Sequence, residues 1–125
     1  MSAVVIKNVE ALEHYRGEHE LEGIRFKSAG RQLGVLAWGM NVLEIAAGCE
    51  LYPEHDHTGD GQQEVYVVLR GSGTLRTSEG EHALAAGDMA LVPPEVKRKI
   101  LPGPEGITVL AIGATPGKVF ASNLG

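Results

Sequence analysis

Short runs of alternating apolar and polar residues, separated by glycine-rich turns, make up most of the chain. In the clearest run, Glu64–Leu69, alternation places Glu64 and Tyr66 on the same face of an extended strand. Comparable runs lie at 4–9, 33–38, 41–45, 74–77, 81–84, 89–92, 96–101 and 107–112. Turn residues recur at the short intervals that are typical of sandwiches and barrels, and no segment keeps a helical period. The pattern predicts an all-β fold, either a small barrel or a jelly roll.

Composition is consistent with one folded domain. The chain has 125 residues, of which 43% are apolar and 22% are charged, close to the average for globular proteins. Its 17 glycines lie between the apolar runs, where an all-β chain turns. We therefore expect a single domain over residues 1–125, with a core at about 33–114 and an N-terminal arm at 1–32.

Charge and cysteine content exclude several classes of protein. The net charge of -5 disfavours a nucleic-acid partner, and the single cysteine, Cys49, rules out an intramolecular disulfide. No apolar run approaches the roughly 20 residues that a membrane-spanning helix needs. The chain also starts without a basic region followed by an apolar stretch. We expect a cytoplasmic protein that binds neither membranes nor nucleic acids.

The densest group of polar residues is a His-x-His pair, His55 and His57, followed by Glu64 on the next predicted strand. Residues two apart on an extended chain point to the same side, so the two imidazoles project together. The intervening loop can return Glu64 beside them. Two imidazoles and one carboxylate are the ligand set of many Fe(II) sites, and Mn, Zn, Ni or Cu also accept such ligands. The alternative is a pair of surface histidines, the interpretation we adopt for His14, His19 and His82.

These residues resemble the first of the two sequence motifs of the cupin superfamily, in which a glycine precedes a His-x-His pair, a glutamate and a second glycine. Here the corresponding positions are Gly48, His55, His57, Glu64 and Gly71. The resemblance covers roughly residues 33–114 and implies the double-stranded β-helix, or jelly roll, of that superfamily. It also implies that His55, His57 and Glu64 are metal ligands.

The second cupin motif is only partly present. Gly87 and Pro93 occupy its opening positions, but Arg98 stands where the family usually has a fourth metal ligand, a histidine. Alternation places Arg98 on the inward face, together with Val96 and Ile100. A protonated guanidinium cannot ligate a metal. Arg98 could bind a substrate carboxylate or phosphate beside the metal, or it could pair with Glu64 and replace the metal.

Two functions remain open at this point. In the first, a metal-dependent cupin acts on a small, anionic molecule, as the dioxygenases and isomerases of the family do, and Arg98 and Tyr66 bind the substrate. In the second, a metal-free barrel binds a small ligand without converting it, and Arg98 neutralises Glu64. We also expect a homodimer, since small cupins commonly pair through their sheet edges. The catalytic residues, substrate and metal are not predicted.

Overall fold

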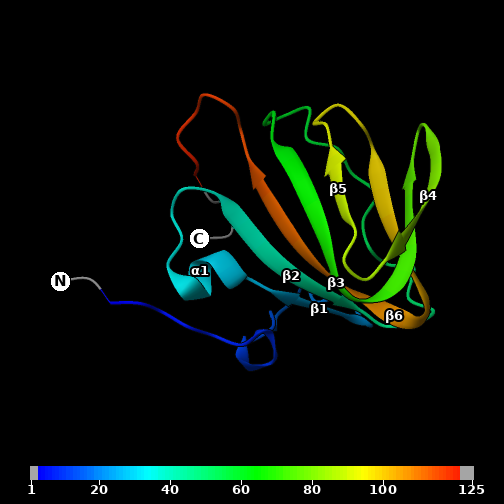
Figure 1. The fold of residues 1–125 in the computed structure, drawn as a ribbon, viewed down its shortest axis with the longest axis horizontal. Helices are drawn as coiled ribbons and strands as arrows, with labels where there is room; N and C mark the ends of the chain where they lie inside the picture. The colour runs from blue at the N-terminus through cyan, green and yellow to red at the C-terminus, as the bar shows by residue number, and fades with distance from the viewer. Residues whose placement is uncertain (1–2, 122–125) are drawn as a thin grey trace.

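The computed structural model describes residues 3–121 and is an antiparallel β structure (Figure 1). Its strands are β1 (Ile24–Lys27), β2 (Gly39–Ile45), β3 (Gln63–Thr77), β4 (Gly80–Ala85), β5 (Met89–Val92) and β6 (Arg98–Ala114). They follow the order β1-β2-β6-β3-β4, and β5 also pairs with β3. Within residues 3–121 the longest helix is α1 (Ala29–Leu33), and no helix is long and apolar enough to span a membrane. The predicted all-β class is confirmed.

The two longest strands, β3 and β6, pair with each other along most of their lengths. The sequence analysis treated Glu64–Leu69 and 74–77 as separate runs with a glycine turn between them, and this prediction is wrong, because both belong to β3. Gly71 has a φ of +74°, and a Cβ atom there would collide with the backbone oxygen of Gly106 on β6. The glycines accommodate a shift of register between the strands, so the ladder bends where the sequence suggested that it stopped.

The N-terminal part differs more from the prediction. Residues 4–8 form no strand, and Val9–Ala11 form a short 3-10 helix, η1. The predicted strand at 33–38 is also absent, because Leu33 ends α1 and Gly34, with a φ of +90°, caps that helix. β1 was not predicted. It pairs with β2 and brings part of the expected arm into the sheet.

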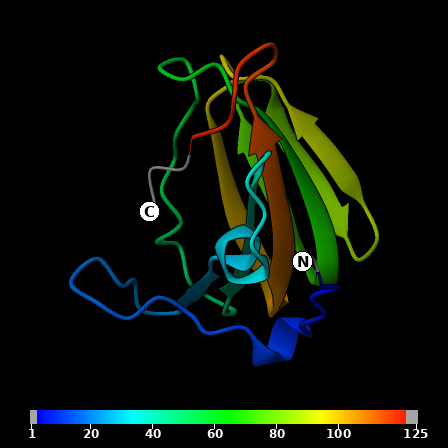
Figure 2. The ribbon, with the colours of Figure 1, turned by 90° about the vertical axis from the view of Figure 1, so that its left-hand side faces the viewer.

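The main core is built from inward-facing residues of all six strands and is completed by the long connection from β2 to β3. Figure 2 shows this connection, residues 46–62, running along one side of the sheet. Tyr52 anchors it, because this side chain is 5% exposed and belongs to the same buried cluster as Leu43, Val68 and Ile100. Val42 points to the other face of β2 and packs against residues of the arm and α1. The connection that carries the two histidines is therefore fixed against the interior of the fold.

Candidate metal centre

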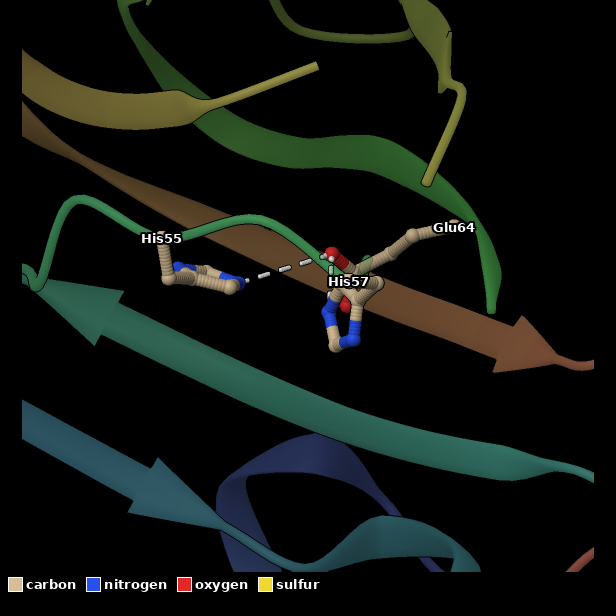
Figure 3. A group of neighbouring side chains, drawn as sticks. All are labelled: His55, His57 and Glu64. Atoms are coloured by element: carbon tan, nitrogen blue, oxygen red, sulfur yellow. Dashed lines mark ion pairs between the residues drawn. The ribbon is translucent and has the colours of Figure 1, made fainter. Parts of the chain in front are cut away.

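The three predicted ligands come together at one end of this connection (Figure 3). The main chain of His55 exchanges hydrogen bonds with that of Arg98, at 3.0 Å and 2.8 Å, and the amide of His57 donates to the carbonyl oxygen of Pro94 at 2.8 Å. The segment therefore lies extended beside the start of β6, and alternation directs both imidazoles to one side. Glu64, near the start of β3, completes the group.

The ligand atoms are spaced for a metal ion. The Nε2 atom of His57 lies 3.5 Å from Oε1 of Glu64, and that of His55 lies 3.9 Å from the same oxygen. The ligand atoms of all three residues lie within 4.8 Å of one another. Ligands about 2.1 Å from a zinc ion are separated by about 3.4 Å in a tetrahedral site. Small side-chain rotations therefore suffice to bring the three atoms onto one ion.

Hydrogen bonds to Nδ1 fix which ring nitrogen of each histidine is free. Nδ1 of His55 lies 2.9 Å from the carbonyl oxygen of Pro53, and Nδ1 of His57 lies 3.1 Å and 3.2 Å from the carboxylate oxygens of Asp60. Both partners accept hydrogen bonds, so Nδ1 carries the proton, and in the neutral form of each ring Nε2 offers a lone pair. Nε2 of His57 is buried and has no hydrogen-bond partner. Three electron-rich atoms thus face one another, which is the arrangement that a cation stabilises.

Two buried tyrosines support Glu64 from behind. The hydroxyl of Tyr66 donates a hydrogen bond of 2.6 Å to Oε1 of Glu64, and the hydroxyl of Tyr52 lies 3.0 Å from that of Tyr66. Because the proton of Tyr66 is directed to Glu64, Tyr52 donates its own proton to Tyr66. Burial raises the pKa of both tyrosines well above the ordinary value for a phenol. Both hydroxyls therefore stay protonated and serve as donors.

Arg98 lies on the inward face, as alternation predicted, and its side chain is fully buried. Its Nη1 atom is 3.8 Å from Oε1 of Glu64, a charge contact too long for a hydrogen bond. Its Nη2 atom donates to the carbonyl oxygen of Pro93 at 2.9 Å, and Nε and Nη1 have no hydrogen-bond partner. The guanidinium thus holds the segment next to Pro94 and places its charge beside Glu64.

A cavity of about 430 Å³ opens beside the three ligands. The sequence analysis expected a pocket that also included Tyr66 and Arg98, but both are fully buried and neither lines this cavity. Both contact Glu64 instead. Their expected role in binding substrate stays a prediction.

Several residues around the site were missed by the sequence analysis. Tyr15, His19 and Leu21, from the segment before β1, line the cavity, although His19 was expected to be a simple surface residue. Its side chain is indeed 82% exposed. No local pattern links this segment to His55, because the contacts span more than thirty residues. Asp60 was also missed, although a carboxylate three residues after a candidate ligand is a recognisable partner for its Nδ1 atom.

Comparison with known proteins places this site in a family. A sequence model of the cupin domain matches residues 41–113. No curated protein matches the chain. Among solved structures, the chain is similar to a cupin protein from Bacteroides fragilis (20% identity, TM-score 0.65, covering 89% of this chain and 92% of that one). It is also similar to a sugar phosphate isomerase of the cupin superfamily from Silicibacter pomeroyi (23% identity, TM-score 0.71, covering 87% of this chain and 75% of that one). A third similar structure is a predicted oxalate decarboxylase from Thermotoga maritima (16% identity, TM-score 0.71, covering 89% of this chain and 99% of that one).

At these identities the similar structures establish the fold but not the activity. The family match includes all three candidate ligands and Arg98. The chain belongs to the cupin domain family, and its antiparallel fold is the jelly roll of that superfamily.

Proposed function

We propose that this cupin binds a divalent transition metal through His55, His57 and Glu64 and acts on a small anionic molecule in the adjacent cavity. The proposal depends chiefly on one observation, that hydrogen bonds to Nδ1 direct the Nε2 lone pairs of both histidines towards Glu64. Three protein ligands leave coordination positions for an oxygen atom of the substrate. Fe, Mn, Zn, Ni and Cu all accept this mixed set of nitrogen and oxygen ligands.

A bound metal of this kind would act as a Lewis acid, polarising an oxygen atom of the substrate. The protein residues provide the positioning. Asp60 and the carbonyl of Pro53 hold the imidazole rings, and Tyr66 fixes the carboxylate of Glu64. The buried wall around Tyr52 excludes water from the inner side of the site.

Arg98 and Tyr66 act, in this proposal, by positioning Glu64 from behind. The guanidinium replaces the histidine that would be a fourth ligand in other cupins, and it brings a positive charge within 3.8 Å of Glu64. That charge repels a cation and weakens its binding. We therefore expect metal affinity lower than that of a four-ligand cupin.

The second candidate is a metal-free module that binds a small ligand. The burial of Arg98 favours it, because a fully buried guanidinium requires a counter-charge and its closest ion-pair partner is Glu64. In either case, a homodimer and a cytoplasmic location remain parts of the proposal.

Metal analysis separates the two candidates. Protein purified without chelators should contain close to one transition-metal ion per chain, and the metal-free form should bind Zn²⁺ in calorimetry. His57→Ala should lower that affinity by at least about a hundredfold, since one of three ligands is lost. His82→Ala is the matched control, because His82 lies on β4, away from the cavity. Absence of metal, together with equal weak Zn²⁺ binding by both variants, would favour the metal-free module.

A further inference from the structure

The wall of the cavity beside the metal centre is mainly apolar. Ile24 and Phe26 of β1 form one part of it, and Leu43 of β2 and Ala111 of β6 form another. Tyr52 and Leu21 extend the same lining. Asn41 contributes the one side-chain amide among the described residues that line the cavity. Such a wall accommodates a hydrocarbon or aromatic body and gains free energy from removing it from water.

The charged residues of the lining are acidic. Among the described residues that line the cavity, the carboxylates are Glu20 and Glu64, and there is no lysine or arginine. A phosphate group or other dianion is normally held by arginine or lysine side chains, which provide both charge and several donors. This cavity supplies none of them.

The neighbouring cations are engaged elsewhere. Lys27, which is 4% exposed, donates to Glu44 and to the carbonyl oxygen of Val9. The Nζ atom of Lys99 donates to the carbonyl oxygens of Glu50 and Tyr52. Arg98 lies behind Glu64, as described above. A side-chain rotation that brought any of these groups into the cavity would break the hydrogen bonds or ion pairs that it makes now.

The charges around the metal position limit the ligand further. At the metal position itself, the two charges of a divalent metal and the charge of Arg98 would be offset by Glu64 and Asp60, which leaves one positive charge there. A single carboxylate or enolate neutralises it. A second negative charge on the substrate would have no counter-charge and would lie near Glu20.

From this arrangement, and assuming the metal site of the proposed function, we infer that the substrate combines an apolar body with a single anionic metal-binding group. A 2-oxo acid or an enolate fits this description. Phosphorylated sugars and small dianions do not, although the similar structures include a sugar phosphate isomerase and a predicted oxalate decarboxylase.

Calorimetry on the Zn²⁺-loaded protein tests the inference with phenylpyruvate, pyruvate, glucose 6-phosphate and oxalate as probes. Phenylpyruvate should bind at least about tenfold more tightly than pyruvate, because it buries a ring against the apolar wall. Glucose 6-phosphate and oxalate should bind more weakly than phenylpyruvate. Phe26→Ala should reduce the preference for phenylpyruvate over pyruvate. Leu91→Ala should not, because Leu91 is exposed on β5 and does not line the cavity.

Zn²⁺ affinity is measured separately for each variant, so that the two proposals can fail independently. If the unaltered protein does not bind Zn²⁺, the proposed function is overturned, and the inference with it. Normal Zn²⁺ binding without a preference for phenylpyruvate over pyruvate would overturn the inference alone. Tighter binding of glucose 6-phosphate or oxalate than of phenylpyruvate would have the same consequence.

Discussion

The main chain of Arg98 exchanges two hydrogen bonds with that of His55, while its side chain lies fully buried behind Glu64. One residue therefore supports two of the candidate ligands by different means. The backbone contact does not depend on the side chain. Substitution of Arg98 consequently removes the buried charge, and with it the hydrogen bond to Pro93, while the strand pairing that places His55 is retained.

Arg98→Met keeps an unbranched, apolar stem in the core but leaves the carboxylate of Glu64 without its cation. The free energy of unfolding of the metal-free protein should fall, by at most about 3–5 kcal/mol, the range for breaking a fully buried ion pair. Because Glu64 is partly exposed to the cavity, we expect the lower part of that range. Denaturant titration measures the change.

The double variant Arg98→Met/Glu64→Gln is the control for this experiment. It removes the unpaired charge, so a substantial part of the lost stability should return. Equal stability of the single and double variants would contradict a coupling between Arg98 and Glu64. Arg98→His should tighten Zn²⁺ binding in calorimetry, because it removes the positive charge and adds an imidazole at the family's usual ligand position.

Tyr66→Phe removes the donor that satisfies Oε1 of Glu64 and leaves the buried hydroxyl of Tyr52 without an acceptor. We expect a loss of about 1–3 kcal/mol in the free energy of unfolding of the metal-free protein. Tyr52→Phe should cost less, because it removes the outer donor and keeps the bond from Tyr66 to Glu64. Thermal or denaturant unfolding of the two variants under the same conditions compares them, and the reverse order would contradict the assigned donor directions.

Asp60→Ala should weaken Zn²⁺ binding by about 10–100-fold, the usual effect of losing a hydrogen-bond partner of a histidine ligand. The physical reason is that Nδ1 of His57 loses the carboxylate that orients the ring. Asp56→Ala is the matched control in the same connection, because the Asp56 carboxylate bonds to Thr58 and not to a histidine. Similar Zn²⁺ affinities of the two variants in calorimetry would show that Asp60 does not support the site.

Gly71→Ala should destabilise the fold far more than Gly87→Ala. Both glycines have positive φ, +74° and +92°, so alanine is strained at either position. A Cβ atom at Gly87 meets no atom within 4 Å, whereas one at Gly71 collides with the backbone of Gly106. We expect a cost of about 1–2 kcal/mol at Gly87 from backbone strain and a larger one at Gly71. Equal melting temperatures would contradict the close approach of β3 and β6.

Stability should depend on pH through Glu10. Hydrogen bonds from Arg70, and the charge of that residue, hold the pKa of Glu10 below its ordinary value. A lowered pKa means that the contribution of this carboxylate is present at neutral pH and is lost as the pH falls through its folded-state value. Glu10→Gln should therefore melt slightly lower than the unaltered protein at pH 7, and the difference should shrink as acidification protonates Glu10. A difference that does not change as the pH is lowered would point to another cause.

The candidate ligands could be predicted from sequence because their geometry is local. His55 and His57 alternate on one extended segment, and the same alternation placed Arg98 inside. The cavity wall could not be predicted, because Phe26 meets His55 only through the tertiary fold. The role of Gly71 could not be predicted for a different reason. A glycine is equally typical of a turn and of a β-bulge, and which of the two forms here depends on how closely β6 approaches.

The placement of the cavity wall has a consequence for the diversification of this scaffold. The candidate ligands lie within ten residues of chain, from His55 to Glu64, while Tyr15, Leu21 and Phe26 enter the cavity from a separate N-terminal segment. Mutations in that segment can reshape the space offered to a substrate and leave the ligand spacing intact. Under the proposed function, this part of the cavity wall can therefore change, by evolution or by design, while the spacing of the candidate ligands is held constant.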